Sequence, residues 1–195
     1  MNEFIQTPDH DTCLDLLKKH GVPDHVIEHS LRVAQAGVFL ALNLKCVGHK
    51  IDVKEVEAGA LLHDIAKIDA IRKGEDHAES GARLLFGLGY PSISGIVRRH
   101  VHIDLPVFKD DVPVLTPAHI VNYADKRVCH TSIVLLSERF EDLVERYGTT
   151  PGKKEMIVRL YKQTKILEGY IFKKLDFGPQ RLCELNAIDI HKISS

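Results

Sequence analysis

Residues 59–67 read GALLHDIAK and place two ionisable side chains, His63 and Asp64, in the most apolar part of a helix that the sequence predicts over 53–67. Each of the two follows an apolar residue of the same helix by three positions, so helical periodicity turns both toward a core. A carboxylate that is buried without a partner costs several kcal/mol or takes up a proton. This stretch therefore predicts a helical protein with a charged site in its interior.

Two further ionisable residues occupy apolar faces of other predicted helices. His29 lies on the flank of the apolar stripe of a helix predicted over 24–43. Asp125 lies among apolar residues in a helix predicted from 117 to about 147. Taken singly, His29 is better explained by a backbone carbonyl partner, and Asp125 is equally well explained by an ion pair with a nearby arginine such as Arg127.

Taken together, the four residues favour a metal site, because one cation satisfies all of them at once. Adjacent residues on a helix point about 100° apart, so His63 and Asp64 can both reach an ion that lies over that edge of the helix. Imidazole and carboxylate ligands suit zinc, iron, manganese or cobalt better than calcium. The sequence therefore predicts a divalent metal ion held by His29, His63, Asp64 and Asp125.

These residues stand in motifs that are similar to those of a known family. EHSLRVA around His29, GALLHDIAK around His63 and Asp64, and NYADKRV around Asp125 resemble the His, His-Asp, Asp signature of the HD superfamily of metal-dependent phosphohydrolases. The resemblance covers about residues 22–147. It implies an all-α fold, a single HD-type bundle, in which the four residues hold a divalent metal ion and water or hydroxide attacks a phosphorus centre.

Within this superfamily the chain looks nearest to the branch of symmetric diadenosine tetraphosphate hydrolases, which carry two more histidines and bind two metal ions. His77, in EDHAESGARLL, and His100, in IVRRHVH, look like those two positions. The resemblance then implies that His77 and His100 bind a second ion and that Asp64 bridges the pair. The expected cofactor is one or two ions of iron, manganese, zinc, cobalt or magnesium. The alternative for His77 is an exposed position in the first turn of its helix.

The chain departs from that branch after His100, where RRHVHIDLP replaces a Thr-Thr-Gly-like turn, so the resemblance leaves the substrate open. Basic side chains near the motifs are candidates for substrate contacts. Lys67 lies one turn beyond the His-Asp pair and can stabilise charge on a phosphate, so Asp64 and Lys67 are the expected catalytic residues. The expected substrate-binding residues are Lys67, Arg99, His102 and Arg127, with Arg98 and Lys126 as further candidates at the entrance. The alternative for these arginines and Lys126 is a solvated helix face.

Composition narrows the class of substrate. The 195 residues include 26 basic and 27 acidic side chains, and aromatic residues make up 6% with no tryptophan, which disfavours a nucleic-acid-binding protein. No uncharged apolar run approaches the about 20 residues that span a bilayer, and the cysteines form no CxxC pair. We therefore expect a cytoplasmic enzyme with no membrane partner that acts on a small phosphorylated substrate, a nucleotide or dinucleotide. The alternative is an HD-type module that binds a nucleotide without turnover.

Helical periodicity predicts about seven helices and no convincing pair of strands. The predicted helices cover residues 9–20, 24–43, 53–67, 77–89, 91 to before 106, 117–147 and 153–176, a short segment around 182 closes the chain, and 104–114 is a loop. The expected organisation is an N-terminal helix in residues 1–21 that packs on the bundle, an HD-type domain over 22–147, and a C-terminal helical extension over 148–195. The apolar stripe beyond residue 150 covers the bundle in this interpretation, and a homodimer contact is the alternative.

Overall fold

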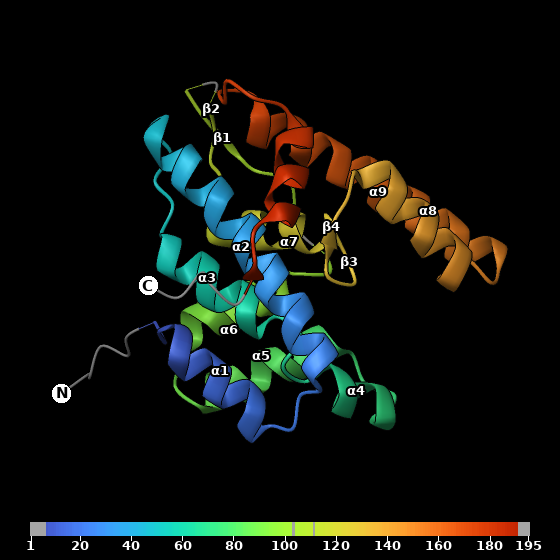
Figure 1. Cartoon of the computed structure of the whole chain (residues 1–195). Helices are drawn as coiled ribbons and strands as arrows, with labels where there is room; N and C mark the ends of the chain where they lie inside the picture. The colour runs from blue at the N-terminus through green and yellow to red at the C-terminus, as the bar shows by residue number, and fades with distance from the viewer. Residues whose placement is uncertain (1–6, 103, 111, 191–195) are drawn as a thin grey trace.

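The computed structural model describes residues 7–102, 104–110 and 112–190, and it is mostly helical (Figure 1). Nine α-helices and one 3-10 helix occur in these residues, which confirms the predicted all-α class. They are α1 (His10–Lys19), α2 (Asp24–Cys46), α3 (Val53–Leu62), α4 (Lys67–Lys73), α5 (His77–Gly87), α6 (Pro91–Arg98), α7 (Pro117–Asp125), α8 (Leu136–Tyr147), α9 (Pro151–Phe172) and the 3-10 helix η1 (Pro179–Ala187).

The bundle is built around α2, the longest helix, which crosses the molecule (Figure 1). α2 packs against α3 and α7, α3 packs against α6 and α7, and α5 packs against α6. The side chains between these helices are small or branched and fully buried, among them Leu40, Leu61 and Val121. α1 packs against α3 and so extends the bundle at the N-terminal end of the described chain.

The C-terminal part lies against the same bundle. α8 and α9 pack side by side and extend to one side of the molecule, while α9 also contacts α7 (Figure 1). Ile157, Leu167 and Ile171 of α9 are buried, whereas Met156 and Ile166 on its other faces are exposed. The homodimer contact of this segment stays a prediction. Within the described residues, no helix combines the length and the apolar character that crossing a membrane requires.

The predicted helix over 53–67 is wrong in its last turn. α3 ends at Leu62, residues 63–66 form a turn, and α4 begins at Lys67. His63 keeps a helical backbone, with φ of −57° and ψ of −35°, but Ala66 just before α4 has left the helical region, with φ of −102° and ψ of 5°. The His-Asp pair therefore lies in a helix-to-helix turn that faces the interior, not in the middle of a helix.

The predicted helix from 117 to 147 is also wrong, because it is two helices joined by a hairpin. α7 ends at Asp125, the antiparallel strands β3 (Val128–Cys129) and β4 (Ser132–Ile133) reverse the chain, and α8 begins at Leu136. His130 takes the turn with a positive φ of 55°. A second two-stranded hairpin, β1 (Phe108–Lys109) and β2 (Val112–Pro113), lies in the segment predicted as a loop.

Gly59 allows α3 and α6 to approach closely. A Cβ atom at this position would lie 2.6 Å from Cγ2 of the buried Ile96. We expect Gly59→Ala to lower the free energy of unfolding, measured by urea denaturation, by about 1–3 kcal/mol because the contact must open. Gly169→Ala is the control, since nothing lies within 4 Å of its Cβ position on α9, and it should raise stability by about 0.5–1 kcal/mol. An unchanged or increased stability of Gly59→Ala would contradict the packing described here.

Candidate metal centre

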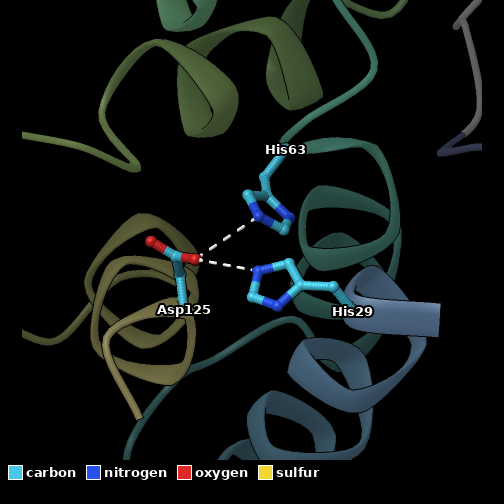
Figure 2. A group of neighbouring side chains, drawn as sticks. All are labelled: His29, His63 and Asp125. Carbon is cyan, nitrogen blue, oxygen red and sulfur yellow. Dashed lines mark hydrogen bonds and ion pairs between the residues drawn. The ribbon is translucent and has the colours of Figure 1, made fainter. Parts of the chain in front are cut away.

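Three segments that are distant in the sequence bring His29, His63 and Asp125 together (Figure 2). His29 comes from α2, His63 from the turn after α3, and Asp125 from the last residue of α7. Oδ1 of Asp125 lies 3.2 Å from Nε2 of His29 and 3.5 Å from Nε2 of His63. One ligand atom from each residue lies within 4.8 Å of the other two, which is close enough for a single ion.

A second group adjoins the first and consists of Asp64, His77 and His100. Oδ1 of Asp64 lies 3.5 Å from Nε2 of His77 and 3.7 Å from Nε2 of His100, and these two nitrogens are 3.1 Å apart. His77 is the first residue of α5, and His100 lies just beyond α6 rather than on it. Oδ2 of Asp64 is 3.3 Å from Nε2 of His63, so the His-Asp pair joins the two groups.

Backbone hydrogen bonds fix how three of the imidazoles face this centre. His29 Nδ1 donates to the carbonyl of His130, His63 Nδ1 to that of Ala60, and His100 Nδ1 to that of Val97, at 2.7–2.8 Å. A carbonyl only accepts, so Nδ1 carries the proton and Nε2 of each neutral ring keeps its lone pair. Metal-binding histidines are commonly oriented in this way.

Two buried atoms at the junction of the groups lack hydrogen-bond partners in the described chain: Nε2 of His63 and Oδ1 of Asp64. Burial opposes ionisation of Asp64, but His63 and Lys67 together hold the pKa of its carboxyl well below the usual range. Burial likewise lowers the pKa of His63, yet Asp64 and Asp125 outweigh it and raise that pKa to about 10. The carboxylates thus draw positive charge to this point, and the donor set fits a divalent cation.

The pKa values of the histidines in the second group shift in the opposite direction from that of His63. Burial lowers the pKa of His77. Burial also lowers the pKa of His100, to about 3, and the neighbouring His63 adds to the effect. Neutral imidazoles are the form that binds a metal ion. His77 and His100 therefore face Asp64 in a state that is ready to act as ligands.

The two groups lie at a cavity with a volume of about 570 Å³. Metal-ligand candidates form part of its lining: His29, Asp64, His77, His100 and Asp125. Apolar and aromatic side chains form another part: Val26, Ile68, Ile71, Val101, Leu143, Tyr147 and Leu160. Four cationic side chains complete it, Lys67, Lys126, Arg139 and Arg146, and the imidazoles of His25 and His130 lie beside them.

The predicted substrate contacts divide between the cavity and the outer surface. Lys67 lines the cavity, and its Nζ donates to Oδ2 of Asp64 at 2.6 Å. Burial opposes the charge of Lys67, but Asp64 outweighs it and raises its pKa, so the ammonium form is favoured. Arg99 and His102 have exposed side chains outside the cavity lining, because the chain leaves α6 at Arg98. Their predicted role in substrate binding is therefore not supported by the geometry.

The assignment of Arg127 to substrate binding is wrong. Its side chain is fully buried, and its Nε and Nη2 donate to the carbonyls of Val134 at 2.6 Å and Pro179 at 3.0 Å. Nη1 donates to the hydroxyl of Tyr123 at 2.6 Å, and that hydroxyl donates to Glu168. The guanidinium of Arg127 therefore joins α7, the segment after β4, α9 and η1, and it takes no part in the cavity.

We expect Arg127→Met to lower the free energy of unfolding by about 3 kcal/mol, because removing one partner leaves buried polar groups unpaired. Urea denaturation followed by circular dichroism measures the effect. Arg99→Met is the control, because Arg99 is exposed, and its stability should change by less than about 0.5 kcal/mol. Equal stability of the two variants would contradict the structural role of Arg127.

Sequence reasoning missed several residues of the cavity, among them His130, Arg139 and Arg146 from the segment that follows α7. They were missed because a continuous helix over 117–147 points its second half away from the ligands, whereas the hairpin turns α8 back toward them. One signal was present. Arg139, Asp142 and Arg146 are spaced three and four residues apart, which places them on one helix face.

Comparison with known proteins shows the family to which the chain belongs. A model of the HD domain family matches residues 26–127, just over half of the chain. The chain is 31% identical over 147 residues to an uncharacterized protein of Methanocaldococcus jannaschii, in a match that covers 69% of this chain and 85% of that protein. The chain belongs to the HD domain family. Members of this superfamily are generally metal-dependent hydrolases, and their HD domains bind divalent metal ions.

Two other proteins are similar over different shares of the chain. A tRNA (cytidine(56)-2'-O)-methyltransferase of Thermoplasma volcanium is 37% identical over 95 residues, which cover 48% of this chain and 26% of that enzyme. The crystal structure of a predicted HD superfamily hydrolase from an uncultured Thermotogales bacterium superimposes with a TM-score of 0.49 and 22% identity. That match covers 85% of this chain and 93% of the other.

Proposed function

We propose that the protein is a metal-dependent phosphohydrolase that cleaves a phosphoester or phosphoanhydride bond of a small nucleotide or dinucleotide. The observation that carries this proposal is the junction at His63 and Asp64. Two ligand groups meet there at one cavity, and buried ligand atoms have no hydrogen-bond partner among the described residues. A buried arrangement of this kind is costly unless a cation completes it. The family supports hydrolysis as the reaction.

The residues of this chain hold and orient what the reaction needs. His29, His63 and Asp125 would hold one ion, and His77 and His100 would hold a second, with Asp64 between the two groups. Divalent ions at such a centre bind phosphate oxygens and lower the pKa of water toward neutrality. The Nδ1 hydrogen bonds to backbone carbonyls keep the rings of three ligands in place.

Lys67 supplies a fixed positive charge beside the ligands. Its ammonium group lies 2.6 Å from Oδ2 of Asp64, and its side chain is 38% exposed, so it reaches from the ligand into the cavity. A cation placed there stabilises negative charge that develops on a phosphate during hydrolysis. This supports the predicted catalytic pair of Asp64 and Lys67.

The cavity suits a nucleotide in size and in lining. Pockets for small ligands usually measure about 300–1,000 Å³, and the volume of about 570 Å³ falls within that range. Ile71 and Tyr147 are exposed at the cavity and offer apolar surface for a base or sugar. The ligand groups and Lys67 would face the phosphate.

The direct test is phosphate release from AMP, ADP, ATP and diadenosine tetraphosphate by protein reconstituted separately with iron, manganese, cobalt, zinc or magnesium. We expect saturable release from at least one nucleotide, lost after chelation and restored by the metal. The chelated and reloaded sample is the control for irreversible damage. Binding of a nucleotide without turnover under every metal would contradict the hydrolase and support a module that binds without catalysis.

A further inference from the structure

The cavity at the metal centre carries more positive charge than its carboxylates balance. Its lining has four cationic side chains, Lys67, Lys126, Arg139 and Arg146, against the two carboxylates of Asp64 and Asp125. Divalent ions held at the centre would add to this excess. A low-dielectric cavity lined by one sign of charge concentrates ligands of the opposite sign. The cavity therefore favours a polyanion over a ligand with a single phosphate.

Two of the four cations are engaged close to the ligand residues. Lys67 pairs with Asp64. Lys126 is buried, and its Nζ donates to the carbonyl of His100 at 2.8 Å and to that of Asn122 at 3.3 Å. These lysines belong to the metal centre and its support. The excess charge that remains for another group of the ligand comes from the two arginines of α8.

The arginines of α8 share one acidic partner. Oδ2 of Asp142 accepts from Nη1 of Arg139 at 2.7 Å, and Oδ1 accepts from Nε of Arg146 at 2.7 Å. One carboxylate between two guanidinium groups leaves a net positive charge. In addition, Nε–H of Arg139 is buried and has no hydrogen-bond partner among the described residues. A buried donor without an acceptor is unfavourable, so the ion pair with Asp142 leaves the donors of Arg139 incompletely satisfied.

The same arginines are linked to the metal centre through the β3–β4 hairpin. Nη2 of Arg146 lies 3.5 Å from Nε2 of His130, which also lines the cavity. The backbone carbonyl of His130 accepts the hydrogen bond that orients His29. The guanidinium groups and the metal ligands therefore face one cavity and can act on two parts of one molecule.

We propose that Arg139 and Arg146 bind a second phosphate of the substrate, separate from the phosphate that reacts at the metal centre. The substrate class is then a nucleotide with two or more phosphates. This inference rests on the proposed function for the identity of the reacting phosphate. Guanidinium groups bind phosphate through paired N–H donors, which makes arginine well suited to this task. Asp142 holds the two side chains in place before the substrate binds.

Isothermal titration calorimetry of the metal-loaded protein tests the proposal with two ligands that resist hydrolysis, adenosine 5′-thiomonophosphate and α,β-methylene-ADP. We expect the wild type to bind the diphosphate at least about tenfold more tightly than the thiomonophosphate. Arg139→Gln and Arg146→Gln should each weaken binding of the diphosphate about tenfold more than binding of the thiomonophosphate. Arg83→Gln is the matched control, because Arg83 is exposed on α5, pairs with Glu75 and does not line the cavity.

The metal content of each variant is measured in parallel. It distinguishes a loss of phosphate binding from a loss of metal caused by displacement of His29. An equal loss of affinity for both ligands, or a loss that follows metal content, would overturn the proposal and assign the arginines to support of the hairpin. A wild type without preference for the diphosphate would overturn it as well. Selective binding without phosphate release from any nucleotide would contradict the hydrolase and leave this inference standing.

Discussion

We expect His63→Ala to lower kcat/KM for nucleotide hydrolysis by about 10³-fold or more, which corresponds to about 4 kcal/mol of transition-state stabilisation. The ring is fully buried, and its Nε2 lies 3.3 Å from Asp64 and 3.5 Å from Asp125, between the two ligand groups. Its removal takes away a metal ligand. It also leaves the carboxylates of Asp64 and Asp125 without the imidazole that partly balances their negative charge. The reaction loses the centre that holds the phosphate and the water.

Steady-state phosphate release measures this loss, and His102→Ala is the matched control. His102 is exposed and lies outside the cavity lining, so its variant should retain wild-type turnover. His29→Ala serves as a second variant in case His63→Ala misfolds. His29 belongs to the same ligand group, but 12% of its side chain is exposed. If both single variants fold and retain wild-type turnover, the assignment of the metal centre is wrong.

Removal of the metal ion is the second large effect, because the folded state alone assembles its ligands. A ligand present at about 1,000 times its Kd stabilises the native state by about 4 kcal/mol. For a chain of this length, each kcal/mol shifts Tm by about 2–4 °C, so chelation should lower Tm by about 8–16 °C. Differential scanning calorimetry with and without EDTA, followed by reloading, measures the shift.

The His63→Ala protein provides the control for this thermal experiment. Because it lacks a ligand of the first group and keeps the second group intact, EDTA should lower its Tm by less than it lowers that of the wild type. A wild type that unfolds at the same temperature with and without chelator, after confirmed loading, would show that the buried carboxylates do not depend on a cation. That result would indicate that a protonated His63, and not a metal ion, balances the charge of the buried carboxylates.

The candidate ligands could be predicted because buried charge leaves a clear mark on a helical sequence. His63 and Asp64 interrupt an apolar run, and the structure brings them to His29 and Asp125 across three segments. The prediction of His77 and His100 rested mainly on resemblance, and the structure places both beside Asp64. The predicted starts of α2 and α5 are also confirmed. α2 begins at Asp24, and the side chain of Asp76 caps the first turn of α5.

The turns that shape the site could not be predicted from local signals. Residues 127–135 contain neither glycine nor proline, and their apolar spacing suits a helix, yet His130 adopts a positive φ and the chain reverses. The turn at 63–66 also lacks both residues. In each case tertiary contacts outweigh propensity. Arg127 failed for a similar reason, because its partners Glu168 and Pro179 lie far along the chain.

The most direct measurement for the central claim is the number of metal ions per chain, determined by elemental analysis of wild type, His29→Ala and His77→Ala. The proteins are purified without chelator or metal-affinity resin, reloaded and desalted. The account predicts two ions in the wild type, with one lost in each variant, because His29 and His77 belong to different ligand groups. A wild type that retains no ion after reloading would contradict a metal centre at His63 and Asp64.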